Sequence, residues 1–235
     1  MITVTQFPFG NRLLCRLSSS DLELVTPQLK PVVLRLKQDL ERPNKPIGDV
    51  YFPDSGIISV VATNPDASRV EAGVIGCEGV SGIAVMLGDD RSPHSTYIQS
   101  AGRGMRMSAA ELRRAMKASP SLQTLLHKYV QTFLVQTAHT AIANARATLP
   151  QRLARWLLMA HDRVQIDQLL LTHEFLSLMM GVRRAGVTET LHGLEHRGLV
   201  EAARGEVTIR NRRGLEKLAG GYYGVPEAEY RRLIG

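Results

Sequence analysis

Two short segments near the carboxyl end of the chain, residues 172–181 and 184–195, carry apolar residues at the spacing of an amphipathic helix. The apolar face of the first consists of Phe175, Leu176, Met179 and Met180, and that of the second consists of Val187, Leu191 and Leu194. The Thr172 hydroxyl can cap the first helix, and Gly181 can end it because glycine tolerates a left-handed backbone. So short a connection predicts a steep crossing that leaves the polar face of the second helix outward.

After Gly198 the apolar pattern changes to the alternation of β-strands. Residues 199–202 and 207–210 are predicted to form a hairpin with a turn at 203–206. The order helix, tight turn, helix, hairpin is typical of a winged helix-turn-helix, with Arg204 at the tip of the wing. The pattern indicates DNA binding, although paired helices with a glycine turn also occur in all-α domains that bind no nucleic acid.

Short apolar runs in the first half of the chain predict strands separated by turns rich in Pro, Gly, Asn and Asp. The predicted strands are 32–34, 49–52, 56–62, 69–74, 95–100 and 104–107, and the turns are 42–46, 53–56 and 64–66. Strands spaced this closely favour a small barrel or roll over a sheet with crossover helices. Ser20 can cap a short helix before the first strand, and a second helix is expected to open at Ser108.

Residues 129–145 contain no formally charged side chain, yet they are too polar for a membrane segment. One apolar stripe consists of Leu122, Leu126, Tyr129 and Phe133, and an adjacent one consists of Val130, Leu134, Ala138, Ala141 and Ala145. Two stripes suit a long helix that packs on its own roll with one face and on a partner's helix with the other. An ordinary core helix in a monomer is the alternative. Pro150 ends this element, so residues 148–150 are the expected hinge.

The chain of 235 residues has room for two modest domains and carries a net charge of +7. The charge is spread along the sequence, so its total supports a nucleic-acid partner only weakly. The helix-turn-helix region is more specific, because it has a surplus of arginine that can pair with phosphates. Its charged residues are Arg183, Arg184, Arg197, Arg204, Arg210, Arg212 and Arg213 against Glu189, Glu195, Glu201 and Glu206.

Neither a signal-peptide pattern at residues 1–14 nor a run of eighteen apolar residues occurs, so we expect a soluble cytoplasmic protein with no membrane partner. Cys15 and Cys77 are too far apart in sequence for a CxxC site, and His192 and His196 lack a third ligand nearby, so no metal is expected. The segment 79–83 lacks the final glycine of a nucleophile elbow, and no phosphate-binding loop motif occurs. We therefore expect no enzymatic activity.

The motifs of the carboxy-terminal region resemble a known family. The run L-T-x-E-F-L-x-x-M-x-G-V-R-R-x-x-V-T, followed by L-x-x-L-E-x-x-G-L-V and R-G-x-V-T-I, is similar to the DNA-binding domain of the CRP/FNR (cyclic-AMP receptor protein/fumarate-nitrate regulator) family of bacterial transcription regulators. Residues 151–160 also resemble the helix that precedes the family's helix-turn-helix. The similarity is specific over roughly the last third of the chain.

The resemblance implies an α+β fold with three parts. These are an amino-terminal cyclic-nucleotide-binding-like β-roll (a double-stranded barrel) at 1–118, a dimerisation helix at 119–147 and a winged helix-turn-helix domain at 148–235. It also implies a homodimer, and the candidate dimerisation residues are Leu122, Leu126, Tyr129, Val130, Phe133 and Ala141. Such a dimer is expected to read a near-palindromic operator on double-stranded DNA, with half-sites about one DNA turn apart. RNA polymerase is a further partner that the family's activators contact.

The family places its base-reading residues on the first two turns of the recognition helix, which here comprise Arg183, Arg184, Ala185, Thr188 and Glu189. Arg184 matches an arginine of the cyclic-AMP receptor protein and could bind guanine through two hydrogen bonds. Ala185 and Glu189 replace the glutamate and second arginine of that protein, so its operator cannot be assumed here. Thr172 is expected to contact phosphate, and Arg204 to reach the DNA backbone or the minor groove.

Cyclic-nucleotide binding in the family depends on a G-E-L loop followed about ten residues later by Arg-Ser. The corresponding residues here are Gly76, Glu78, Arg91 and Ser92, but Cys77 separates the Gly and Glu and the gap is longer. Three alternatives therefore remain, namely a cyclic nucleotide, another small effector in the same cavity, or a degenerate roll that only supports the dimer. Two cysteines cannot supply the four ligands of the family's iron-sulfur cluster.

We therefore expect a dimeric transcription regulator that is gated by a small effector in the roll. A ligand-independent regulator or a partner-binding protein with a degenerate sensor is the alternative. An enzyme hidden in the roll would need Glu78 and His94 together in one pocket.

Overall fold

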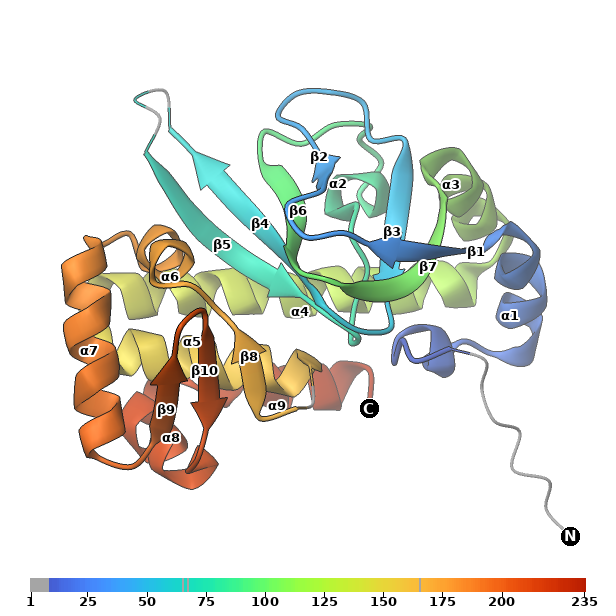
Figure 1. Ribbon diagram of the computed structural model, residues 1–235. Coiled ribbons are helices and arrows are strands. Elements are labelled where there is room, and N and C mark those ends of the chain that lie inside the picture. Colours follow the sequence, from blue (N-terminus) through green and yellow to red (C-terminus); the bar gives the residue numbers. More distant parts are fainter. Residues whose placement is uncertain (1–8, 65, 67, 165) are drawn as a thin grey trace, which may run out of the picture.

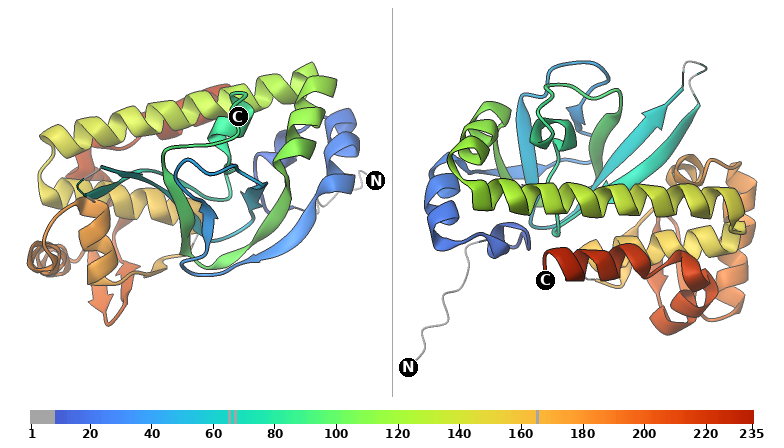
Figure 2. Two further views of the ribbon diagram at one scale, coloured as in Figure 1. Left: turned by 90° about the horizontal axis from the view of Figure 1, so that it is seen from above. Right: turned by 180° about the vertical axis from the view of Figure 1, so that it is seen from behind.

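The chain forms a β-roll, one long helix and a helical carboxy-terminal part that carries a small sheet (Figure 1). The computed structural model describes residues 9–64, 66, 68–164 and 166–235. The first eight residues of the amino-terminal segment and Pro65 of the expected 64–66 turn therefore lie outside the described residues. The long helix α4 (Pro120–Arg146) crosses the whole molecule, with the roll on one side and the carboxy-terminal helices on the other (Figure 2).

Two antiparallel sheets build the roll, with strand orders β1-β7-β3 and β2-β6-β4-β5. Its strands are β1 (Lys30–Leu34), β2 (Asp39–Glu41), β3 (Asp49–Pro53), β4 (Ile57–Thr63), β5 (Arg69–Ile75), β6 (Ser95–Ser100) and β7 (Gly102–Ser108). Its helices are η1 (Leu14–Arg16), α1 (Ser19–Val25), η2 (Thr26–Gln28), α2 (Ile83–Met86) and α3 (Ala109–Ala118). All six predicted strands form. The sequence pattern did not indicate β2 and α2, which are too short to show a period.

Serine side chains cap the N-termini of α1 and α3, the helices before the first strand and after the last strand of the roll. The predicted cap at Ser20 is wrong, because the Ser18 hydroxyl accepts the hydrogen bond from Asp21 N and Ser20 lies inside α1. At α3 the Ser108 hydroxyl accepts from Glu111 N, and the Glu111 carboxylate accepts from Ser108 N. This reciprocal pair fixes the point at which the last strand becomes a helix.

Helix α4 has a buried face and an exposed face, and the candidate dimerisation residues fall mostly on the buried one. Leu122, Leu126, Tyr129, Val130 and Phe133 pack within the chain's own core, and only Ala141 of that set is exposed. The first five therefore offer no free surface to a partner. The exposed stripe consists of Leu134, Ala138, Ala141, Ile142 and Ala145, which includes four of the five residues of the second predicted stripe.

The carboxy-terminal part is built on α5 (Leu149–Val164), which follows α4 after a short break. The remaining elements are β8 (Gln168–Leu170), α6 (His173–Met180), α7 (Arg184–His196), β9 (Val200–Ala203), β10 (Glu206–Ile209), α8 (Arg212–Ala219), η3 (Gly220–Tyr222) and α9 (Val225–Leu233). Helix α9 returns along α4 toward the roll (Figure 2). Among the described residues, none of the helices combines the length and the apolar character that crossing a membrane requires.

One hydrophobic core joins the roll to the carboxy-terminal part. Ile57, Val61 and Val74 of the roll belong to the same buried cluster as residues of α5, α6 and α7. Within this cluster the rings of Trp156 and Phe175 meet edge to face, with centroids 5.8 Å apart. The helix-turn-helix is therefore packed directly against the roll.

A buried carboxyl group lies at this junction. Glu71 of β5 accepts hydrogen bonds from Trp156 Nε1 and from Ser59 Oγ, both at 2.6 Å. The Ser59 hydroxyl is also 3.7 Å from Met179 Sδ of α6. Burial raises the pKa of Glu71 from 4.5 to about 7, although these hydrogen bonds and the nearby Arg163 and Arg155 lower it.

The raised pKa of Glu71 predicts a stability that changes with pH. The stabilising effect of its proton is fully present below pH 4.5 and is lost as the pH rises through about 7. Since Glu71→Gln keeps the neutral form at every pH, its free energy of unfolding relative to the wild type should rise by ~3 kcal/mol between pH 5 and pH 8. Urea unfolding at both pH values measures this change. A constant difference between the two proteins would contradict the assignment.

Candidate nucleic-acid interface

Helices α6 and α7 meet through a tight connection whose geometry follows from local residues. The Thr172 hydroxyl accepts a hydrogen bond of 3.1 Å from Phe175 N and so caps α6, as predicted. Gly181 ends the helix with φ at 62°, in the left-handed region. The Ser177 hydroxyl donates to Val182 O at 2.6 Å and holds the connection closed. Helix α7 therefore begins at Arg184, only three residues beyond Gly181.

Helix α7 buries Val187, Leu191 and Leu194, as the apolar spacing predicts. Its other face is turned to the outside at one end of the molecule (Figure 1). That face is hollowed by a shallow open depression, lined by Arg184, Ala185, Thr188, Glu189 and His192. Four of the five residues predicted to read bases thus share one outward surface.

The other candidate contacts lie close to that surface. Arg183 is the N-cap residue of α7, and its side chain is exposed together with those of Arg184 and Ala185. Thr188 is only partly exposed, and its hydroxyl donates to Arg184 O at 3.1 Å and lies 2.9 Å from His173 Nδ1. The contact with His173 links α6 to α7, a link that sequence reasoning missed. The position of His173 at the start of α6 was the only local signal for it.

The wing is a three-stranded sheet with the order β8-β10-β9. Arg204 and Gly205 form the turn between β9 and β10, and Arg204 is exposed at the tip. Across the hairpin Arg210 forms an ion pair with Glu201. The strand β8 was not predicted, because its three residues lie far from the hairpin in sequence and carry no alternation of their own.

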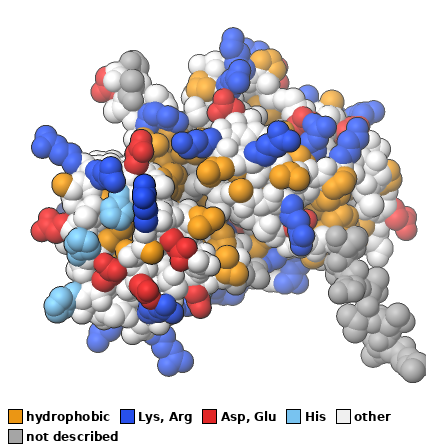
Figure 3. Space-filling model, viewed as in Figure 1, with side chains coloured by type: hydrophobic (Ala, Val, Ile, Leu, Met, Phe, Trp, Pro, Cys, Tyr) orange, Lys and Arg blue, Asp and Glu red, His pale blue; other side chains and the backbone are white. Residues whose placement is uncertain are grey.

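Arginine side chains without an acidic partner remain on this end of the molecule. Arg210 pairs with Glu201, and Arg212 pairs with Asp162 and Glu216. Within the described part of the chain, ion pairs are absent from Arg183, Arg184, Arg197, Arg204 and Arg213, all of which are exposed. Figure 3 shows basic and histidine side chains, with some carboxylates between them, over the end of the molecule formed by α6 and α7.

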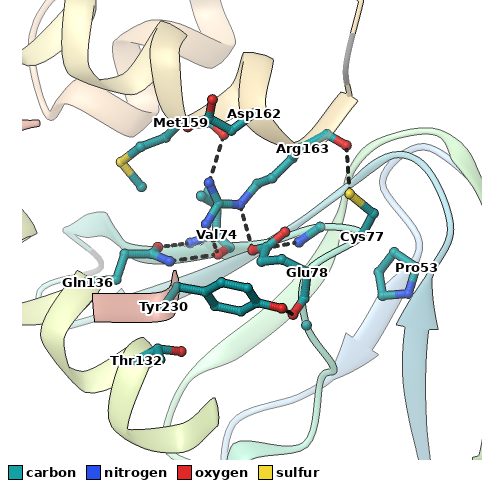
Figure 4. A network of polar contacts seen from close by, with 12 residues as sticks. Pro53, Val74, Cys77, Glu78, Thr132, Gln136, Met159, Asp162, Arg163 and Tyr230 are labelled. Carbon is teal, nitrogen blue, oxygen red and sulfur yellow. Dashed lines mark hydrogen bonds and ion pairs between the residues drawn. The ribbon is translucent and has the colours of Figure 1, made fainter. Parts of the chain in front are cut away.

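The four residues predicted to bind an effector do not form one constellation. Glu78 follows β5 and lies 2.9 Å from Arg163 Nε of α5, while Gly76 N donates to Glu78 Oε1 at 3.3 Å (Figure 4). Arg91 is exposed and pairs with the adjacent Asp90 at 2.9 Å. The Ser92 hydroxyl accepts a hydrogen bond from His94 N. Because Glu78 pairs with Arg163, neither Arg91 nor His94 is its partner.

The Glu78–Arg163 pair is buried, with side chains 14% and 8% exposed. Burial by itself lowers the pKa of Arg163, but the charges of Glu78, Glu227 and Asp162 raise it overall, so the guanidinium stays charged. The other guanidinium nitrogens donate to Met159 O at 2.7 Å and Val74 O at 3.3 Å. In the part of the chain that is described, groups of three or more His, Cys, Asp or Glu side chains able to hold a metal ion are absent.

Comparisons with known proteins agree with this architecture. Residues 151–218 match the family described as the Crp-like helix-turn-helix domain. Comparison with curated proteins gives no significant match. The resemblance to the CRP/FNR family predicted from the sequence is confirmed in the helix-turn-helix domain.

Solved structures extend the agreement to the fold of most of the chain. A structure from Eubacterium rectale assigned to the CRP/FNR family of transcriptional regulators matches with a TM-score of 0.68 and 17% identity, covering 88% of this chain and 97% of that one. FixK2 from Bradyrhizobium japonicum matches with a TM-score of 0.69 and 16% identity, covering 82% of this chain and 98% of that one. The c-di-GMP-responsive regulator CLP of Xanthomonas campestris matches with a TM-score of 0.63 and 20% identity, covering 82% of this chain and 99% of that one. The predicted α+β fold of roll, long helix and winged helix-turn-helix is therefore confirmed.

Removal of the Thr172 hydroxyl should destabilise the start of α6. Thr172→Ala leaves Phe175 N without its cap and should lower the free energy of unfolding by about 1 kcal/mol. Thr172→Ser keeps the accepting oxygen and serves as the matched control. Chemical unfolding of the three proteins measures the difference. Equal losses in both variants would show that the methyl group, and not the cap, stabilises this site.

Proposed function

We propose that the protein is a dimeric, sequence-specific DNA-binding transcription regulator of the CRP/FNR type. The single observation that carries this proposal is the outward face of α7, at whose start the exposed Arg183 and Arg184 have no acidic partner among the described residues. A helix that follows a tight turn and exposes one of its faces has the geometry needed to enter the major groove. The division into sensor (1–118), dimerisation helix (119–147) and DNA-binding domain (148–235) is part of the same proposal.

In the proposed complex, α7 lies in the major groove and Arg184 donates two hydrogen bonds to a guanine. Glu189, five residues later and in the same depression, is placed to accept from a cytosine amino group. Arg183 and Thr188 are further base-reading residues in this proposal. Thr172 at the start of α6 contacts phosphate, and Arg204 on the wing reaches the adjacent backbone or minor groove. Because Ala185 and Glu189 stand where the cyclic-AMP receptor protein has a glutamate and a second arginine, the operator of that protein is not assigned to this chain.

The exposed stripe of α4 is the proposed dimer interface. Seen from behind in Figure 2, α4 crosses the molecule with no other element in front of it. Leu134 and Ile142 are 53% and 50% exposed there, and small alanines lie between them. Two copies of this uncharged stripe can pack about a two-fold axis, which would give the dimer two recognition helices for a near-palindromic operator.

Regulation without a cyclic nucleotide in the roll is the second candidate, and the charge pairing favours it. Glu78 already pairs with Arg163, and Arg91 pairs with Asp90. A cyclic nucleotide bound through Gly76, Glu78, Arg91 and Ser92 would require both pairs to rearrange. Contact with RNA polymerase remains part of the proposal for an activator.

Arg184→Ala should weaken binding to the selected operator by about 1–3 kcal/mol and relax base preference at one position in each half-site. Selection from random DNA followed by gel-shift titration with operator and mismatched duplexes measures both effects. Arg114→Ala is the matched control, because Arg114 is an exposed arginine on α3 at the opposite end of the molecule (Figure 1). A uniform loss on all sequences would assign Arg184 to phosphate instead.

Leu134→Glu should dissociate the dimer, because it buries a carboxylate in an apolar interface, and should raise the dimer dissociation constant at least ~10-fold. Leu87→Glu adds the same charge at a leucine that is 62% exposed on the roll and should leave the dimer intact. Sedimentation equilibrium measures the association, and circular dichroism checks that both variants fold. A dimer that tolerates Leu134→Glu would place the interface elsewhere.

A further inference from the structure

A cavity of about 770 Å³ lies where the roll meets the carboxy-terminal helices, away from the proposed DNA surface. Segments from both halves of the molecule line it, including Arg12 and Glu78 from the roll and Arg163 and Arg231 from α5 and α9. Its volume is within the range of about 300–1,000 Å³ typical of sites for small ligands. The cavity is therefore large enough for a metabolite.

Part of the cavity wall is a network of polar contacts. Glu78 and Arg163 are paired there, and Tyr230 of α9 donates a hydrogen bond of 2.8 Å to Glu78 O (Figure 4). Gln136 of α4 is held by Val74, whose N donates to Gln136 Oε1 at 2.7 Å. These contacts hold this part of the cavity wall in one arrangement.

Positive charge is in excess around the cavity. Five arginines line it against the carboxylates of Glu78, Asp162 and Glu227. Two of these carboxylates already have partners, since Glu78 pairs with Arg163 at 2.9 Å and Asp162 with Arg212 at 2.7 Å. Glu227 accepts from Gly224 N at the start of α9.

The remaining arginines are Arg12, Arg16 and Arg231. They form no ion pair with any acidic side chain in the described ranges. Arg12 donates to Asp162 O at 3.3 Å, which leaves its charge without a counter-ion. Three positive charges at one partly enclosed cavity repel each other less when an anion lies between them.

We propose that this cavity binds a small oligoanion, a ligand with several negatively charged oxygens of the phosphate or carboxylate type. Arg16 and Arg231, from η1 and α9, supply guanidinium groups that bind such oxygens in pairs. The ligand would contact the roll and the carboxy-terminal helices at once. If the proposed regulator function holds, this position lets the ligand change how the two halves pack and thereby the affinity for DNA.

Isothermal titration of the full chain with pyrophosphate and, separately, with citrate tests the site in 0.15 M salt without DNA. At least one of the two probes should bind once per chain, and the responding probe identifies phosphate or carboxylate as the source of the charge. Arg16→Gln combined with Arg231→Gln should weaken that binding at least ~10-fold, because two charge-assisted contacts are lost.

Arg232→Gln is the matched control, because Arg232 neighbours Arg231 on α9 but pairs with Glu229 and does not line the cavity. It should leave the binding of the probe unchanged within about twofold, since it removes a surface charge only. Absence of saturable binding by both probes, or an equal loss in Arg232→Gln and in Arg231→Gln tested alone, would overturn the proposal. Thermal unfolding of each variant confirms that it folds.

The titration is independent of DNA, so failure of the proposed regulator function would leave its result intact. Conversely, if the protein selects an operator but binds neither probe, the proposed regulator function stands and the proposed oligoanion site is overturned. Operator affinity with and without the bound probe then measures the coupling between the two sites.

Discussion

The enclosure of α5 is the constraint on which the rest of the structure depends. Its residues 153–160 are all buried, because the helix packs on β4 and β5 of the roll, on the helix-turn-helix and on α8. A helix buried on all sides cannot rotate without breaking several contacts at once. The outward direction of α7 and the position of the roll are therefore set by the same core.

Polar groups buried at this junction make the packing specific. Glu71 accepts from Trp156, and Arg155 donates to Tyr222 O and Thr140 Oγ1. Burial lowers the pKa of Arg155 to about 10, so the guanidinium still carries its charge near neutral pH. Buried groups of this kind are costly unless their partners are in place, and a change in domain packing would separate them. The junction therefore favours one arrangement of the roll and the carboxy-terminal helices, and ionisation of Glu71 would destabilise that arrangement.

Arginine has two different roles at the two ends of the carboxy-terminal part. On α7 and the wing, arginines are exposed and separated from carboxylates, which suits phosphates and base edges. At the cavity, the unpaired arginines are also exposed, but they lie beside tyrosines and the buried Glu78–Arg163 pair. Both surfaces are connected through α5 and the helices packed on it, so ligand and DNA would act on one continuous core.

The sequence by itself determined the local elements, because helical spacing, the Thr172 cap, Gly181 and the alternation after Gly198 act over a few residues. Those signals predicted the winged helix-turn-helix, the six longer strands of the roll and the two stripes of α4. Only the tertiary structure decided which α4 stripe is exposed and that Glu78 pairs with Arg163. It also placed Glu71 beside Trp156, 85 positions away. Such contacts depend on how whole elements pack, and no local pattern carries that information.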